Sequence, residues 1–282
     1  MVPRKNTAKD LWQPRRRIEV TYKRSLRQIV KKMNQVLKGV HSISEIIRVL
    51  KKLADTPEFK KYAERSAMKM VTSLFSDAGK TWREAAKVNS RGRAIFEALK
   101  NEMNGPIGVV VNEQIQKNAE LIKSLPLDLA QNVTEYASKQ AFEGRRAEDI
   151  AKDLLRDIPE MSEKKANLIA RTEVAKTNTT LIRARCDMTG NRFYIWKTCK
   201  DQRVRTSHDH MDDVIVLWNE PPNPEKLAGE KDYGNYYHAG CFPNCRCYPS
   251  IVDIDFISWP HKVYHNGKIQ NMMKKQFEEI VA

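Results

Sequence analysis

The sequence has little glycine and little proline. Only 11 Gly and 12 Pro occur among 282 residues, which argues against collagen-like repeats, Gly/Ser linkers and loop-rich all-β folds. Apolar runs are also short, and none approaches the roughly 18 residues of a membrane-spanning helix. No apolar segment of the kind found in secretory signals follows the charged start. We therefore expect a soluble protein without a membrane span, made in a cytoplasm.

Common catalytic motifs are missing as well. The patterns GxxxxGK[ST], HExxH and GxSxG do not occur. The residue types of a nuclease site gather in one segment, at Asp201, Arg203, Arg205 and His208. There a histidine could act as general base and an arginine could hold a phosphate. The alternative is an ion-pair network that fixes the turn after a strand, with Arg171 and Glu173 able to join it. We favour the network and expect no enzymatic activity.

Positive charge is abundant and unevenly placed. Lys and Arg number 50 against 35 Asp and Glu, a net charge of +15. Residues 1–40 hold twelve basic and only two acidic residues. This segment is either a solvated tail or a surface that faces a polyanion, and we favour the polyanion. The candidate DNA-binding residues are Arg15, Arg16, Arg17, Lys23, Arg24, Arg27 and Lys31. Phosphate contacts carry no base information, so we expect non-specific binding of double-stranded DNA.

Apolar residues recur at spacings of three and four from residue 18 to about residue 188, which predicts a series of helices. In the first helix Ile18, Tyr22 and Leu26 share one face, and basic residues fall away from it. Ser42 and Glu45 form a capping-box pattern at the start of the second. Aromatic residues at helical spacing are interpreted as core.

Glycine and proline predict where these helices end. Both are poor helix formers, so we expect breaks at Gly79, ahead of Pro106, near Pro126 and at Pro159. A further helix is expected over residues 82–103. The helix that begins at Ser162 is expected to pack on the strands that follow.

After Gly190 the pattern becomes that of strands. Residues 193–196, 214–217 and 245–252 are rich in aromatic and β-branched residues, and residues 269–281 form a final amphipathic piece. We predict a mainly α N-terminal portion followed by a small α+β module with a short, mostly antiparallel sheet. The expected divisions are a basic segment with the first helix (1–40), a helical domain (41–160), the α+β module (161–255) and a C-terminal tail or helix (256–282).

Three of the five cysteines lie within seven residues. If residues 245–247 form a strand, Cys245 and Cys247 share a face. With Cys241 and a histidine, His208 or His238, they could complete a tetrahedral zinc site. Three interpretations stay open: structural zinc, buried reduced thiols, and a disulfide formed late, outside the reducing cell. The candidate ligands are Cys241, Cys245, Cys247 and His208, and no cofactor other than this structural zinc is indicated.

One ordered set of motifs extends over some 85 residues. It comprises Ala170-Arg171-Thr172-Glu173, Asn178, Trp196, Asp201, Arg203, Arg205, His208, Pro221-Pro222 and Asn244-Cys245-Arg246-Cys247. In order and spacing the set resembles the phage Mu protein F-like head morphogenesis family, the minor capsid proteins of tailed bacteriophages. We interpret Arg171, Glu173, Trp196, Asp201, Arg203 and Arg246 as its structural residues. The loop from Pro224 to Gly240 is longer than the family pattern.

The resemblance implies a structural component of the virion. It would be a minor capsid protein in the interior of the phage head, made in the host cytoplasm and bound near the portal. Its expected roles are procapsid assembly and DNA packaging, delivery or ejection. The implied partners are the portal protein, a scaffold or major capsid protein, and non-specific double-stranded DNA. The alternative is a metal-assisted nuclease or toxin-like enzyme that uses Asp201 and His208.

Overall fold

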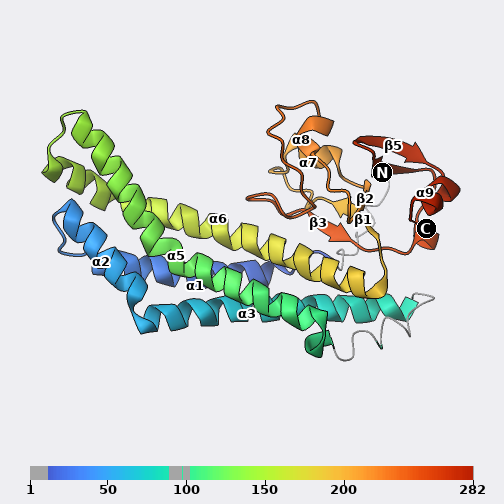
Figure 1. The fold of residues 1–282 in the computed structure, drawn as a ribbon, viewed down its shortest axis with the longest axis horizontal. Helices are drawn as coiled ribbons and strands as arrows, with labels where there is room; N and C mark the ends of the chain where they lie inside the picture. The colour runs from blue at the N-terminus through green and yellow to red at the C-terminus, as the bar shows by residue number, and fades with distance from the viewer. Residues whose placement is uncertain (1–11, 89–96, 98–101, 282) are drawn as a thin grey trace, which may run out of the picture. The chain divides into compact units, whose positions relative to one another are not determined.

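The computed structural model describes residues 12–88, 97 and 102–281 (Figure 1). The helices are α1 (Arg16–Val36), α2 (Ile43–Asp55), α3 (Pro57–Val88), α5 (Pro106–Phe142), α6 (Ala147–Thr189), α7 (Thr206–His210), α8 (Pro224–Leu227) and α9 (Lys274–Val281), with short 3₁₀ helices at Glu102–Asn104 and Ile254–Phe256. Most of the helix expected over residues 82–103 lies outside the described residues. In the part of the chain that is described, no helix combines the length and apolar character needed to cross a bilayer.

The chain groups into two compact units. The first, here called the helical unit, consists of Arg16–Ser73 and Asn112–Glu173. The second, the sheet unit, contains the described residues of 1–15, 74–111 and 174–282. Helices α3, α5 and α6 contribute residues to both units. The divisions expected at residues 40, 160 and 255 are based on sequence pattern, whereas these two units are defined by contacts in space. The sequence-based divisions therefore stay a prediction.

The helical unit is held by the apolar faces of its helices. Leu26 of α1 and Leu50 of α2 are fully buried, as is Ile122 of α5. The hydroxyl of Tyr22 in α1 donates to the amide oxygen of Asn118 in α5 at 3.3 Å, inside this core. The polar residues of α1 face outward because burying an unpaired charge costs far more than solvating it.

The predicted capping box forms at the start of α2. The Ser42 hydroxyl oxygen accepts from the backbone N–H of Glu45 at 3.3 Å. The Glu45 carboxylate in turn accepts from the backbone N–H of His41 at 3.3 Å. The bond to Ser42 satisfies one of the backbone donors that a helix N-terminus leaves free, and the Glu45 carboxylate reaches back to the residue before the cap, so the sequence signature and the observed cap agree.

The sheet unit contains a five-stranded sheet. Its strands are β1 (Phe193–Lys197), β2 (Ile215–Leu217), β3 (Tyr248–Ser250), β4 (His261–His265) and β5 (Lys268–Met272). They lie in the order β3-β1-β2-β4-β5. Only the β2–β4 pair is parallel, and the other three pairs are antiparallel. A mainly helical first part followed by a small, mostly antiparallel α+β region confirms the predicted fold class.

Alternation along β1 divides the core of this unit into two layers. Tyr194 and Trp196 belong to a cluster that includes Ile182 and Cys186 of α6. Ile195 belongs to a cluster on the other side, with Phe277 of α9. Successive side chains of a strand point to opposite faces, so one strand supplies both layers. The C-terminal part of α6 therefore packs against the sheet, as expected.

Three of the predicted helix breaks are wrong. Gly79 lies inside α3, Pro126 inside α5 and Pro159 inside α6. A proline inside a helix costs about 3 kcal/mol relative to alanine. Burial of neighbours such as Leu125 and Ile158, at 6% and 1% exposure, offsets part of that cost. Tertiary packing therefore overrides the local signal at both prolines.

The C-terminal part also differs from the sequence-based prediction. Strands β4 and β5 were not predicted, and β5 occupies the start of the segment expected to be a single amphipathic piece. The third strand is shorter than expected, because residues 245–247 precede β3 and lie outside it. His208 lies on the short helix α7, in the segment where the sequence indicated a turn after a strand.

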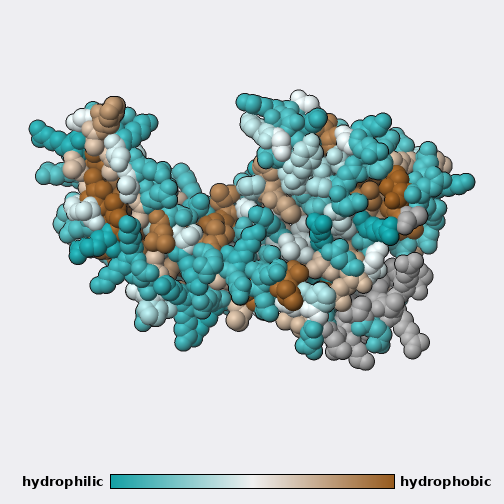
Figure 2. Space-filling model, viewed as in Figure 1, coloured by the Kyte–Doolittle hydropathy of each residue, from teal (hydrophilic) through white to brown (hydrophobic). Residues whose placement is uncertain are grey.

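The surface shows the polar character of the composition. On the face drawn in Figure 2, most of the area is hydrophilic and hydrophobic residues gather in separate patches. A mean hydropathy of −0.62 and a net charge of +15 account for this distribution.

Candidate metal centre

Three buried side chains with metal-binding atoms converge in the sheet unit. His208 comes from α7, and Cys245 and Cys247 come from the segment that leads into β3. Their exposed fractions are 2%, 3% and 3%. One ligand atom from each lies within 4.8 Å of the other two. Although residues 245–247 are not in a strand, both sulfurs still face the same histidine, so these three residues could hold a metal ion such as zinc.

The distances fit a tetrahedral zinc site. The Nδ1 atom of His208 lies 3.3 Å from Sγ of Cys245 and 3.5 Å from Sγ of Cys247. Tetrahedral zinc, with Zn–S near 2.3 Å and Zn–N near 2.0–2.1 Å, places sulfur and nitrogen about 3.6 Å apart. Both nitrogen–sulfur distances lie within a few tenths of an ångström of that value, and all three atoms lie within 4.8 Å of one another, so an ion could contact all three after small movements.

The two thiols differ in how readily they ionise. The pKa of Cys245 is lowered, first by the hydrogen bond with the Cys247 thiol and then, against the effect of burial, by His208. The pKa of Cys247 is raised by that same hydrogen bond and by burial. One proton therefore leaves the pair readily while the other is held between the sulfurs. A bound cation would favour loss of the second proton, because thiolates are the ligands that zinc takes.

Aromatic rings and a close backbone contact enclose the site. The rings of Trp196 and Phe242 pack edge-on against His208, with centroids 5.7 and 5.9 Å away. Gly240 has a φ of +83°, and a Cβ there would lie 2.8 Å from the carbonyl oxygen of Cys247. Only glycine combines that backbone angle with such a close approach. The surroundings exclude water and hold the cysteine segment in place.

The other candidate ligands, Cys241 and His238, are not members of this cluster. The pKa of the half-buried thiol of Cys241 is raised to about 11, mainly by burial. His238 is bonded through Nδ1 to the Tyr194 hydroxyl at 3.2 Å. Burial lowers the pKa of His238 to about 4, with a further contribution from Arg183. Assignment of Cys241 as a ligand therefore stays a prediction.

Asp201 takes part in an ion-pair network. It pairs with Arg246 at 3.1 Å and with Arg203 at 3.8 Å, and it accepts from the backbone N–H of Arg203 at 3.0 Å. Burial alone would raise the pKa of Asp201, but the Arg203 N–H and the two guanidinium charges outweigh it and lower the pKa. Arg205 lies nearby, donates to the carbonyl of Pro243 at 3.1 Å and covers the Phe242 ring.

Arg171 and Glu173, two further motif residues of α6, lie in the helical unit. Arg171 pairs with Glu19 of α1 at 3.7 Å. Glu173 is buried at 7% exposure, and its charge adds to the effect of burial in raising the pKa of Tyr22. Both residues therefore connect α6 to α1 within this unit.

The candidate DNA-binding residues are mostly exposed. Six of the seven are exposed and Lys23 is half-buried. Arg15 pairs with Asp77 at 2.8 Å, and Arg27 pairs with Glu163. Their role in DNA binding stays a prediction.

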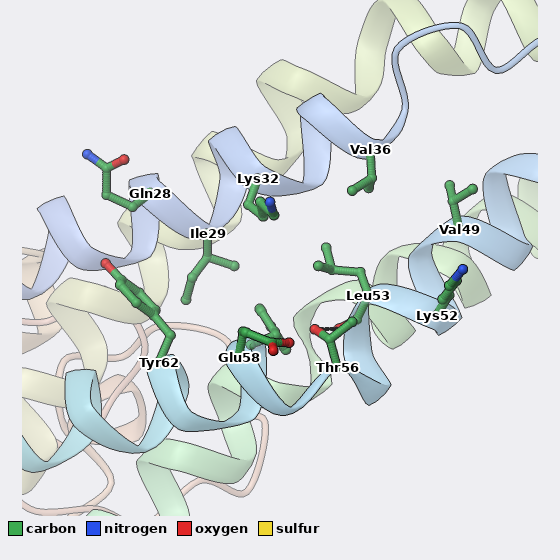
Figure 3. A pocket seen from close by; sticks show the side chains of 11 residues that line it. Gln28, Ile29, Lys32, Val36, Val49, Lys52, Leu53, Thr56, Glu58 and Tyr62 are labelled. Atoms are coloured by element: carbon green, nitrogen blue, oxygen red, sulfur yellow. Dashed lines mark hydrogen bonds between the residues drawn. The ribbon is translucent and has the colours of Figure 1, made fainter.

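The helical unit also has a pocket of about 700 Å³ between α1, α2 and the start of α3 (Figure 3). Ile29, Val36 and Leu53 supply apolar lining, and Lys32 lies above Glu58 across the opening in this view. Its lining includes neither histidine nor cysteine. The pocket therefore offers a surface for apolar contact and no evident catalytic group.

Sequence reasoning missed two residues next to the cluster, one of which contacts His208 directly. Tyr237 bonds through its hydroxyl to Nε2 of His208 at 3.0 Å. The same hydroxyl donates to the Glu225 carboxylate at 2.6 Å. Both residues come from the long loop between β2 and β3, where no periodic pattern marks them. The only available signal was their position in a loop rich in tyrosine.

Comparison with known proteins identifies a domain. Residues 131–249 match the model of the family described as Phage Mu protein F like protein. The chain is also 26% identical over 283 residues to an uncharacterized protein of Haemophilus influenzae. That alignment covers 93% of this chain and 58% of the relative's length. No solved structure matches the chain significantly. The matched region contains all three residues of the cluster and begins within α5, ahead of the predicted module.

Proposed function

Because residues 131–249 form a phage Mu protein F-like domain, which implies a phage head morphogenesis protein, we propose that this chain is a minor capsid protein of a tailed bacteriophage. The family match is the observation that carries the proposal. The protein would be bound near the portal inside the head and would act in procapsid assembly and in DNA packaging or delivery. Its partners would be the portal protein, a scaffold or major capsid protein, and packaged DNA.

A particle experiment tests this proposal. In the phage or prophage that encodes the chain, we expect the protein in purified procapsids and in DNA-filled heads. Cross-linking should join it to the portal protein. Deleting its gene should reduce the yield of DNA-filled heads, and the complete gene should restore it. Absence of the protein from both particle types would contradict the proposal, as would a normal yield of infectious particles without it.

The contacts of the cluster favour a non-enzymatic role over a nuclease. Nδ1 of His208 faces two thiols and Nε2 is bonded to Tyr237, so both ring nitrogens are occupied by protein groups. The Asp201 carboxylate is similarly occupied by Arg203 and Arg246. A general base needs a nitrogen or oxygen that can reach substrate. Metal-dependent DNA or RNA cleavage that disappears in a folded His208→Ala variant would establish the nuclease instead.

We further propose that the cluster holds a structural zinc ion in this protein. The purified chain is expected to contain about one zinc per molecule by elemental analysis. Replacing Cys245 or Cys247 with Ser should abolish zinc retention. It should lower the free energy of unfolding by about 1–3 kcal/mol through an ill-matched buried hydroxyl, and by more when zinc is lost.

Two other cysteines provide controls for this experiment. Cys199 is half-buried and lies outside the cluster, so Cys199→Ser should leave the zinc content unchanged. Loss of zinc affinity in Cys241→Ser would make Cys241 the fourth ligand, and unchanged affinity would remove it from the ligand set. Reduced thiols without metal in the freshly purified parent protein would contradict the zinc site.

A further inference from the structure

The imidazole of His208 is the first member of a series of hydrogen bonds in which His208 and Glu225 are buried and Tyr237, between them, is half-buried. Its Nε2 atom lies 3.0 Å from the Tyr237 hydroxyl, and that hydroxyl lies 2.6 Å from Oε1 of Glu225. Glu225 is 7% exposed, and its second carboxylate oxygen has no hydrogen-bond partner among the described residues. Burying a carboxylate costs free energy unless strong hydrogen bonds compensate for it. The hydrogen bonds from His208 to Glu225 therefore constrain the groups that they join.

The chemistry of the three groups fixes the direction of the bonds. An ionised carboxylate only accepts hydrogen bonds, so Glu225 takes the single proton of the Tyr237 hydroxyl. The tyrosine oxygen can then only accept from His208, which requires a proton on Nε2. A neutral imidazole carries one ring proton, so Nδ1 is left with a lone pair. That lone pair faces the sulfurs of Cys245 and Cys247.

Local structure holds Glu225 and Tyr237 in position. Glu225 lies on α8, whose N-terminus is capped by the Asn223 side chain, which accepts from the Lys226 N–H at 3.1 Å. The same Asn223 side chain donates to Asp232 at 2.7 Å. The backbone N–H of Tyr237 donates to the Pro222 carbonyl at 3.0 Å. The loop between β2 and β3 is therefore closed on itself and presents Glu225 and Tyr237 from two separate points.

We propose that Glu225 and Tyr237 are positioning residues for a zinc ion: they hold His208 in the Nε2–H tautomer and direct Nδ1 toward the two thiolates. This inference rests on the zinc site proposed above and adds its outer shell. Metal-ligating histidines commonly donate their second ring N–H to such a partner, and loss of the partner weakens metal binding by about 10–100-fold. Tyr237 accepts from His208 and donates to Glu225, so it transmits the effect of the Glu225 charge to the imidazole ring of His208.

The test uses the full chain with zinc removed and then restored under reducing conditions, with affinity measured by competition against a chelator. Tyr237→Phe removes the hydroxyl and keeps the ring that packs on Phe242 at 4.8 Å. We expect its zinc affinity to fall by about 10–100-fold. Glu225→Gln should also weaken binding, because an amide can donate to the tyrosine and reverse the bond directions. Tyr236→Phe, at a tyrosine that is 59% exposed in the same loop, is the matched control and should bind as the parent does.

A direct view of the tautomer separates positioning from general stability. Side-chain nitrogen NMR of the zinc-free parent should show His208 protonated on Nε2, and Tyr237→Phe should show a mixture of tautomers at an unchanged melting temperature. A parent that binds no zinc overturns the metal site itself. A parent that binds zinc while Tyr237→Phe binds equally tightly, with the same tautomer, overturns the positioning role alone. Neither result depends on where the protein lies in the particle.

Discussion

Gly240 shows how one residue holds the cluster in place. Its φ of +83° is a conformation that residues with a Cβ rarely adopt, and an added Cβ would lie 2.8 Å from both the Cys247 carbonyl oxygen and the Thr179 hydroxyl. Gly240→Ala is therefore expected to destabilise the protein through backbone strain and through displacement of the cysteine segment. Chemical denaturation of the purified variant measures the change in the free energy of unfolding.

Gly234 provides the matched control because it also has a positive φ, +71°, but an added Cβ would meet no atom within 4 Å. Gly234→Ala should cost about 1–2 kcal/mol from the backbone term alone. Gly240→Ala should cost about 1–2 kcal/mol more, because a backbone oxygen cannot move as freely as a surface side chain. Equal costs for the two variants would show that the segment around Cys247 yields without strain.

Sequence reasoning at this scale found the candidate ligands but not the residues that support them. His208, Cys245 and Cys247 carry metal-binding atoms, so their residue types alone marked them as candidates. Tyr237 and Glu225 are common residue types, and their importance depends on a loop closure that brings them to one imidazole. Such closure follows from non-local contacts, which neither periodicity nor composition encodes.

At the scale of elements, a local signal for the missed hairpin was present. Strands β4 and β5 are joined by Asn266-Gly267, with φ values of +52° and +76°. Asn-Gly is the pair that the tightest two-residue hairpin turn favours. The two flanking strands have five residues each, and only Val263, Tyr264 and Met272 among these are buried, so the composition of the strands concealed what the turn indicated. Turn chemistry was the better guide here than hydrophobic pattern.

At the prolines inside helices, by contrast, the local sequence signal was misleading. Pro159 also leads to a prediction. Pro159 lies inside α6 and is exposed, so it contributes little packing while it removes one backbone donor. Pro159→Ala should therefore stabilise the protein by about 1–3 kcal/mol. Denaturant titration followed by circular dichroism checks the direction and the size of the change.

Pro126 in α5 is the comparison for this variant because it is buried. Pro126→Ala gains the same helical propensity but loses apolar contact in the core, so its net gain should be smaller than that of Pro159→Ala. A destabilised Pro159→Ala variant would mean that α6 needs the proline for its path, and the propensity argument would fail.

At the scale of the whole molecule, the net charge of +15 is the dominant property. A charge of this size attracts polyanions from any direction, so weak DNA binding alone would not identify a DNA-binding surface. The hypothesis that the exposed basic residues of α1 bind DNA is more specific, because these residues project from one helix of the helical unit. A useful experiment must therefore compare equal changes in charge at two places.

The comparison is between two triple variants of the full chain. Arg16, Arg24 and Lys31 of α1 are exposed, and so are Lys61, Arg65 and Lys69 of α3. Replacing either set with Glu changes the net charge by the same amount within the same helical unit. If α1 contacts phosphates, only the first triple should weaken binding strongly. It should also reduce the slope of log affinity against log salt by about 2–3, since each lost phosphate contact contributes roughly 0.9.

Binding of non-specific duplex DNA at several salt concentrations gives both numbers. Equal effects of the two triples would assign the binding to overall charge and remove the special role of α1. An unchanged affinity and slope in both would remove DNA as the partner of this helix. An acidic protein surface would then be the better account of its basic residues, because such a surface can use the same charges without releasing the counterions condensed on DNA.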